Sequence, residues 1–283
     1  MDYKYKELEL AQKIYENGFL SEKHRPTELR LLATYMRRNL NYKPKRLREE
    51  MDAWCKKHVV GYRQETYYKL LKSATTQACK KDSTLVQINQ IEIYQYEMDH
   101  IDTRKISSEY AYDCRKLLFT LLFHMKINQI ILEQKNTELA TTYQGLYFKG
   151  GKRKYTELKK LAKLPVKLRI NEDIIHTLWT HQLVTPLHDG LIRLDFLHDL
   201  QRLQEQTSSI DTTVVVQIRD YDSVGWYYDY YQQNKRIAFC KLCGSIFRKH
   251  SNNDLYCSDK CKQLIKNQNN RKYKKNKLEK EES

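Results

Sequence analysis

Glycine and proline are scarce in this sequence, and long apolar runs are missing from it. The chain has 8 glycines and 4 prolines among 283 residues, together about 4% where an average chain has roughly 12%. Because sandwiches and barrels use these residues at many tight turns, the scarcity argues against an all-β architecture. The longest apolar run, 117–123, is far shorter than the about 20 residues that cross a bilayer, so we expect no membrane span.

Motifs of several enzyme classes are also missing. The sequence has no GxxxxGKS/T, GxGxxG, HExxH or GxSxG motif, and we predict no small-molecule substrate. It opens without the apolar segment of a secretory signal, so we expect a cytoplasmic location, where thiols stay reduced. The seven cysteines are therefore interpreted as metal ligands or, for Cys55, Cys79 and Cys114, as small hydrophobic residues.

Positive charge is present in excess and is concentrated in two segments. The chain has 51 Lys and Arg against 35 Asp and Glu, which gives a formal net charge of +16. Residues 149–169 contain nine bases and one acid, and residues 235–280 contain fourteen bases and three acids. The rest of the chain is nearly neutral, so the basicity is local. Such segments favour a polyanion as the partner.

The pattern of apolar residues predicts a mainly helical protein with three folded parts. Residues 1–107 show helical spacing of apolar side chains throughout, and we predict a helical N-terminal domain there. A second domain is predicted at 108–205 and a small C-terminal domain at 237–283. Residues 206–236 are predicted to connect these two domains through one strand, 214–218, and an aromatic-rich segment.

The segment 108–205 combines predicted helices with one hairpin. Apolar residues between 110 and 125 form a helical stripe, a short amphipathic helix is predicted at 155–164, and a third helix at 171–182, capped by its first residue, Asn171. Asp189-Gly190 between two apolar stretches, of which the second is 191–196, predicts a hairpin. In this order of elements the segment resembles winged-helix DNA-binding domains, and we predict a winged-helix-like domain with a small β hairpin.

The resemblance to winged helices implies that the third helix enters a major groove while the hairpin touches the DNA backbone. The outward residues of that helix are expected to reach base edges or phosphates: Thr177, Thr180 and His181. Phosphate contacts are expected from bases on the hairpin and near the second helix: Arg193, Lys159, Lys160, Lys163 and Lys167. Glu172 and Asp173 would repel a phosphate at the helix start, so a domain that contacts only proteins is the alternative.

Four cysteines near the C-terminus have the spacing of a metal site. Two residues separate Cys240 from Cys243, thirteen separate the pairs, and three separate Cys257 from Cys261. Four thiolates complete the tetrahedral shell of a structural Zn²⁺. Gly244 can take the positive φ of a tight turn, and the second pair lies on one face at the start of a predicted helix. Between the pairs we expect a hairpin with its turn at 251–254.

The CxxCG and YCSxxC runs that hold these cysteines resemble treble-clef zinc fingers, over about 40 residues of the chain. The resemblance implies a structural zinc finger at the C-terminus. Treble clefs also occur in His-Asn-His nucleases, but four cysteine ligands leave no open position on the metal. With its helical front and basic middle segment, the whole chain is similar to proteins of phages and other mobile elements in low-GC Gram-positive bacteria.

After the last cysteine the chain continues as a basic run with helical spacing. No acid occurs between Asp259 and Glu279, and such a run binds phosphates by charge. The bases expected to contact nucleic acid here are Lys262, Lys266, Arg271, Lys272, Lys274 and Lys275. A disordered solubilising tail is the alternative interpretation.

These features predict a non-catalytic zinc protein that binds nucleic acid, with duplex DNA as the expected partner, in regulation or replication of a phage or mobile element. One alternative is a nuclease or phage-defence effector, for which the compact acid groupings at 99–102 and 220–222 are the candidates. Another is an adaptor that binds a host or element protein through residues 1–107. The aromatic residues at 221–231 favour docking between domains, with stacking on unpaired bases as the alternative.

Overall fold

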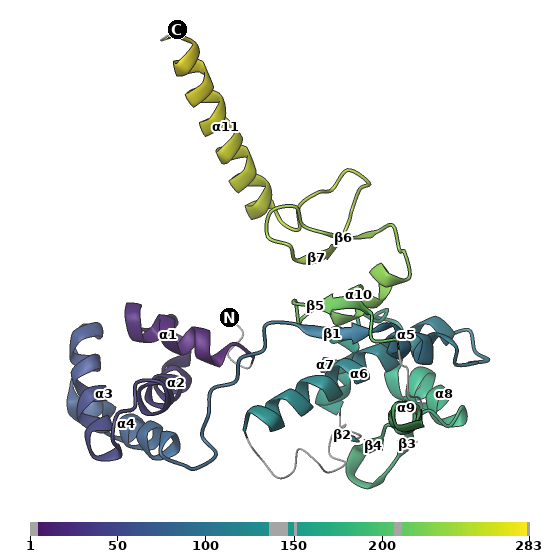
Figure 1. Ribbon diagram of the computed structural model, residues 1–283, viewed down its shortest axis with the longest axis horizontal. Helices are drawn as coiled ribbons and strands as arrows, with labels where there is room; N and C mark the ends of the chain where they lie inside the picture. The colour runs from purple at the N-terminus through teal and green to yellow at the C-terminus, as the bar shows by residue number, and fades with distance from the viewer. Residues whose placement is uncertain (1–4, 136–146, 150–151, 207–210, 282–283) are drawn as a thin grey trace. The chain divides into compact units, whose positions relative to one another are not determined.

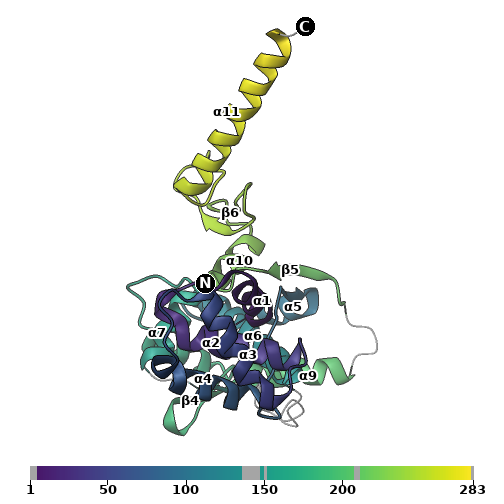
Figure 2. The same cartoon turned by 90° about the vertical axis from the view of Figure 1, so that its left-hand side faces the viewer.

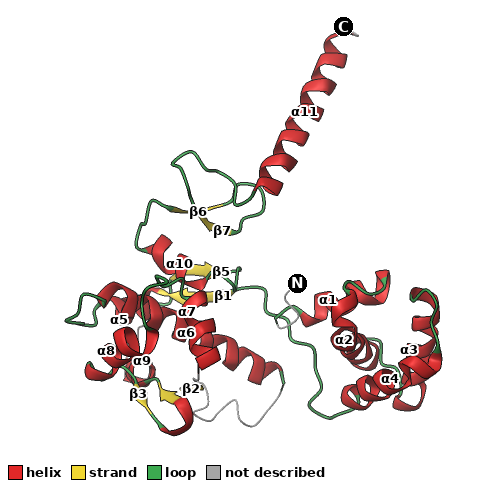
Figure 3. Ribbon diagram, turned by 180° about the vertical axis from the view of Figure 1, so that it is seen from behind, coloured by secondary structure: helices red, strands yellow, loops and turns green. Residues whose placement is uncertain are grey.

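The computed structural model of the protein describes residues 5–135, 147–149, 152–206 and 211–281. Within these ranges the chain is mainly helical with a few short strands (Figure 3), so the predicted fold class is confirmed at this level. The chain divides into two compact units, Met1–Asn89 with Lys126–Gln144, and Gln90–Met125 with Gly145–Ser283. The finer division at 107, 205 and 236 stays a prediction. None of the described helices combines the length and the apolar character that crossing a membrane requires.

The first unit is a cluster of amphipathic helices around one core (Figures 1 and 2). Its elements are α1 (Glu7–Asn17), the 3-10 turn η1 (Glu22–His24), α2 (Arg25–Arg38), α3 (Pro44–His58) and α4 (Gln64–Ala78). Ile14, Leu32, Leu47 and Leu71 supply one buried side chain from each α-helix. Pro44 at the start of α3 lacks only a backbone N–H that would have no partner there, and the apolar residues Leu47, Met51 and Trp54 that follow it lie in the core.

The second unit is organised around α6 (Ala111–Gln134), whose final residues, from Lys126, belong to the first unit. Every residue from Lys116 to Phe123 is buried, so this part of the helix is covered on all sides and not only along the predicted stripe. The aromatic segment forms α10 (Val224–Tyr231), where Tyr228 packs against Phe119 with ring centroids 5.6 Å apart. Lys116 Nζ lies 2.6 Å from the carboxylate of the buried Asp229. The aromatic segment is therefore largely core.

Gly225 in α10 lies very close to the end of α7 (Lys152–Leu161). A Cβ at this position would lie 1.9 Å from the carbonyl oxygen of Ala162. We expect Gly225→Ala to lower the free energy of unfolding by about 3 kcal/mol, because overpacking costs roughly 1–3 kcal/mol and a backbone oxygen cannot rotate away. Chemical denaturation measures the change. Ser73→Ala on the exposed face of α4 is the control, and equal unfolding midpoints for the two variants would contradict this packing.

A three-stranded antiparallel sheet in the order β2-β4-β3 holds the predicted hairpin. Its strands are β2 (Tyr147–Lys149), β3 (Thr185–Pro186) and β4 (Leu191–Arg193). The hairpin at Gly190 is confirmed, with φ +70° at this glycine and the 3-10 turn η5 (His188–Gly190) in the connection. The second strand is shorter than predicted, because α9 (Asp195–Gln206) begins two residues after Arg193.

The predicted helix 171–182 is present but begins at Ile170 and ends at Thr180. A π-helical turn, η4 (Ile170–Ile175), leads into α8 (His176–Thr180). Asn171 is not the cap, because the helical turn begins one residue earlier, where the carboxylate of Asp173 accepts the backbone N–H of Arg169 at 2.7 Å. Ile174 and Leu178 are buried, whereas Trp179 is 51% exposed.

A two-stranded antiparallel sheet completes the body of the second unit. It pairs β1 (Ile91–Tyr94) with β5 (Val214–Ile218), which confirms the strand predicted at 214–218. The helix α5 (Gln95–Asp102) follows β1 directly. The C-terminal part of the unit adds β6 (Ile237–Phe239), β7 (Ile246–Arg248) and α11 (Asp259–Glu281). Tyr227 and Tyr230 of α10 both contact the ring of Phe239, so the aromatic segment also supports β6.

Candidate metal centre

A short hairpin carries the first cysteine pair in its turn. The strand β6 pairs antiparallel with β7, with Phe239 opposite Ile246, so the segment 240–245 connects them. The N–H of Gly244 donates to the carbonyl oxygen of Cys240 at 2.9 Å, and φ at Gly244 is +71°. Because this left-handed conformation favours glycine, the predicted role of Gly244 in the cysteine turn is confirmed.

The hairpin predicted between the two cysteine pairs is wrong. The strand 246–248 pairs with 237–239, which precedes the first pair. Residues 251–254 still form a turn, since the carboxylate of Asp254 accepts the backbone N–H groups of His250 at 2.9 Å and Ser251 at 3.0 Å. These hydrogen bonds lower the pKa of Asp254. The turn predicted at 251–254 is therefore present, but the strand before it, 246–248, pairs with 237–239 and not with the segment after the turn.

The second cysteine pair lies at the start of α11. Ser258 precedes this helix, and its hydroxyl oxygen accepts the N–H of Cys261 at 3.3 Å, which satisfies one of the unpaired donors of the first turn. The sulfurs of Cys257 and Cys261 are 3.7 Å apart. The predicted arrangement of both sulfurs on one face at a helix start is confirmed.

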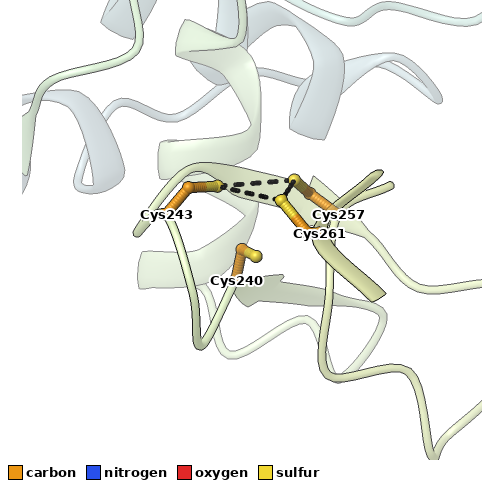
Figure 4. A group of neighbouring side chains, drawn as sticks. All are labelled: Cys240, Cys243, Cys257 and Cys261. Atoms are coloured by element: carbon orange, nitrogen blue, oxygen red, sulfur yellow. Dashed lines mark hydrogen bonds between the residues drawn. The ribbon is translucent and has the colours of Figure 1, made fainter. Parts of the chain in front are cut away.

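The four sulfurs lie together as one cluster (Figure 4). All of them are within 4.8 Å of one another, and the sulfur of Cys243 is 3.5 Å from that of Cys257 and 3.8 Å from that of Cys261. A tetrahedron with zinc–sulfur bonds of about 2.3 Å has edges of about 3.8 Å. The cluster could therefore hold a metal ion, and four soft sulfur donors are consistent with zinc. No other group of three or more His, Cys, Asp or Glu in the described ranges is placed to do so.

The pKa values of Cys240 and Cys257 are shifted in opposite directions. Burial raises the pKa of Cys240, but hydrogen bonds from nearby backbone amides outweigh it and lower this pKa to about 6. Burial and the three neighbouring sulfurs raise the pKa of Cys257 to about 12. Ionisation of Cys257 near neutral pH is therefore opposed by its burial and by its hydrogen bonds with the neighbouring sulfurs. A divalent cation among the sulfurs would balance the charge of four thiolates.

The remaining three cysteines lie outside the cluster. Cys55 and Cys114 are buried as predicted, and burial raises the pKa of each thiol to about 12. Cys79 is exposed, which corrects the expectation that it packs as a small hydrophobic residue. It lies after the end of α4, beyond the last apolar position of that helix.

Two of the lysines predicted to contact phosphates are engaged within the protein. The ammonium of Lys159 donates to the carbonyl oxygen of Val166 at 2.6 Å and also to that of Leu168. The ammonium of Lys163 lies 4.6 Å from the ring centroid of Trp226. Both side chains stabilise the turn after α7 and its contact with α10.

The other bases of this region are more open. Lys160 and Lys167 are exposed. Arg193 is half-buried on β4, where its guanidinium pairs with the carboxylate of Asp195 and donates to the hydroxyl oxygen of Thr185 at 3.2 Å. Of the five bases predicted to contact phosphates in this region, Lys160 and Lys167 are therefore the exposed ones.

The polar residues expected to read bases on the third helix make internal hydrogen bonds. The hydroxyl of Thr177 donates to the carbonyl of Asp173 at 2.7 Å, and that of Thr180 donates to the carbonyl of Thr177 at 2.8 Å. The Nδ1 of His181 lies 2.9 Å from the Thr177 carbonyl oxygen, and its Nε2 accepts the N–H of Ser107 at 3.0 Å. One neutral imidazole, protonated on Nδ1, satisfies both contacts. The role of these three residues in base reading stays a prediction.

The bases predicted after the last cysteine lie on α11. Lys266, Arg271 and Lys272 are exposed, and Lys262, also exposed, lies 3.5 Å from Asp259. Lys274 and Lys275 are on the same helix, and their side chains lie outside the described ones. Figure 1 shows α11 as one unbroken helix, and Cys261 lies in its first turn.

The acid groupings considered for catalysis have local structural contacts. The carboxylate of Asp102 accepts hydrogen bonds from the hydroxyl of Tyr228 at 2.9 Å and the amide of Gln232 at 2.8 Å. The carboxylate of Asp220 accepts the N–H of Asp222 at 3.0 Å. These acids stabilise a helix end and a turn, which is the ordinary role of such residues.

In comparisons with known proteins, the chain matches no protein-family model, no curated protein and no solved structure. Fold and site together define a mainly helical protein with a four-cysteine cluster near its C-terminus that could bind a metal ion.

Proposed function

We propose that this chain is a zinc-containing protein that binds nucleic acid, with duplex DNA as its partner. The attachment of a basic helix to the four-cysteine cluster carries the proposal. The cluster includes Cys261 in the first turn of α11, so a bound metal fixes the start of this helix. The described side chains of the bases that follow, Lys262, Lys266, Arg271 and Lys272, are exposed, and no acid interrupts the basic run before Glu279. A fixed basic helix without acids is a surface for phosphate groups.

We propose Zn²⁺ as the metal and a treble clef as the type of finger. The support is the cysteine turn within a hairpin, the second pair at a helix start, and sulfur distances close to a tetrahedral edge. With four thiolate ligands the metal has no open position, so its role is structural. The proposed role in a phage or mobile element depends on the resemblance of the chain, mainly in its CxxCG and YCSxxC runs, to proteins of such elements.

A winged-helix-like domain at 108–205 is the second part of the proposal. Its support is the element order α6, β2, α7, η4–α8, β3, β4 and the sheet order β2-β4-β3. Lys160 and Lys167 are available for phosphates. Thr177 and His181 would first have to exchange their internal hydrogen bonds, so we assign the main nucleic-acid contacts to α11.

Binding of the zinc-loaded full chain to three labelled probes tests this function. The probes are a duplex of about 30 base pairs and single-stranded DNA and RNA of equal length, at about 50 mM salt. We expect saturable binding to the duplex with a Kd of about 1 µM or lower and weaker binding to the other two. Failure to bind any of the three contradicts the proposed function. A clear preference for RNA or single-stranded DNA overturns the assignment to duplex DNA.

A further inference from the structure

A row of side-chain amides runs along α11 between its bases. Gln263, Asn267 and Asn270 follow one another at intervals of four and three residues, so their side chains share one face of the helix. All three side chains are exposed, and none of their amide groups has a hydrogen-bond partner among the described residues. Asn is a weak helix former because its amide competes for backbone groups. Two asparagines on one face of a helix interior therefore reduce helix stability without a compensating contact in the described structure.

The charges on either side of this amide face are positive. Lys266 lies between Gln263 and Asn270 on the same side of the helix, and Arg271 borders Asn267 one turn later. Lys262 and Lys266 are four residues apart, and like charges at this spacing destabilise an isolated helix. Phosphate groups beside the helix would remove that cost. The three amides, Lys266 and Arg271 therefore have no side-chain partner among the described residues, and another molecule can supply one.

The size and chemistry of α11 match the major groove of duplex DNA. Its 23 residues give a length of roughly 35 Å, and an α-helix has a diameter of about 10–12 Å, which fits a groove about 12 Å wide. A side-chain amide recognises adenine there in a bidentate way, because its NH₂ donates to N7 while its oxygen accepts from N6. The minor groove offers no such unique pattern.

We propose that the amide face of α11, formed by Gln263, Asn267 and Asn270, enters the major groove and reads adenines in neighbouring base pairs. This inference rests on the proposed binding to duplex DNA and adds the element and the residues that give sequence preference. Lys266 and Arg271 hold the flanking phosphates, while the metal cluster at the start of α11 fixes where the helix enters. The amides therefore govern which sequence is bound, and the bases govern how strongly any duplex is bound.

The test is site selection from a randomised duplex library by the zinc-loaded full chain and its variants. Asn267→Ala/Asn270→Ala removes two amides from the face, and Gln268→Ala/Asn269→Ala removes two amides of the same helix that point elsewhere. Because alanine is the better helix former, circular dichroism should show the helix retained in both. We expect the first variant to bind the selected site roughly 10- to 100-fold more weakly, with affinity for an unrelated duplex unchanged within about twofold.

The control variant should keep the wild-type sites and affinities. A wild-type chain that selects no A·T-containing site, or a first variant that keeps the same site at the same affinity, overturns the amide-face inference and leaves general duplex binding standing. A chain that binds no duplex at all overturns the proposed function itself. The two failures are therefore distinguishable in one set of measurements.

Discussion

Replacing Cys257 with serine is expected to release the metal and unfold residues 237–265. The buried part of this segment is small, since its buried apolar residues among those described are Ile237, Cys240, Ile246, Phe247 and Cys261. Such a core cannot fold a segment alone, and zinc binding supplies roughly 10–16 kcal/mol in comparable small domains. Elemental analysis after dialysis should show zinc falling from about one per chain to near zero. Hydrogen exchange should show loss of amide protection in 237–265.

Cys79→Ser is the matched control for this experiment. Cys79 is exposed and lies outside the cluster, so its replacement should leave the zinc content and the protection of 237–265 unchanged. Retention of stoichiometric zinc and of a folded segment by Cys257→Ser would contradict the ligand assignment.

Removing three bases from α11 is expected to weaken binding to duplex DNA about 500-fold at 0.1 M salt. The variant combines Lys266→Ala, Arg271→Ala and Lys272→Ala, whose side chains are all exposed. Each phosphate contact releases counterions and adds about 0.9 to the slope of log affinity against log salt concentration, so three contacts contribute nearly three decades at 0.1 M. Measured across 50–200 mM salt, the slope should become less steep by about 3.

A variant with the same change in net charge separates a local effect from a general one. Lys57, Lys69 and Lys72 are exposed on the first unit, and their replacement by alanine should change the Kd by less than about threefold, since exposed charges that contact no phosphate are screened by salt. Equal losses in the two triple variants would show that binding is not centred on α11.

The cysteine cluster could be predicted from the sequence because its geometry is local. A turn that needs Gly244 at positive φ and a pair one helical turn apart place two sulfurs together in each case. Strand pairing is not local in this way. Residues 246–248 carry no mark that distinguishes a partner before the first cysteine from one after the second, and β2, three residues long, is too short to show a period.

The contacts of individual charged and polar side chains also could not be predicted from the sequence. The sequence predicted phosphate contacts for Lys159, Lys160 and Lys163 alike. In the structure, however, Lys159 donates to backbone carbonyl oxygens and Lys163 lies over the ring of Trp226. Long lysine stems pack along apolar surface while the ammonium finds a nearby acceptor or ring. Likewise, the helical spacing placed His181 on the outward face of a helix, but both of its ring nitrogens make hydrogen bonds within the protein. Such contacts depend on which loop folds back beside the helix.

Metal content and salt-dependent duplex binding, measured on one sample of the full chain, test most directly whether a zinc-anchored basic helix binds DNA. We expect about one zinc per chain and an affinity that falls steeply between 50 and 200 mM salt, with a slope of about −4 to −6 in log affinity against log salt. A metal-free folded chain, or an affinity that stays constant over this range of salt, would contradict it.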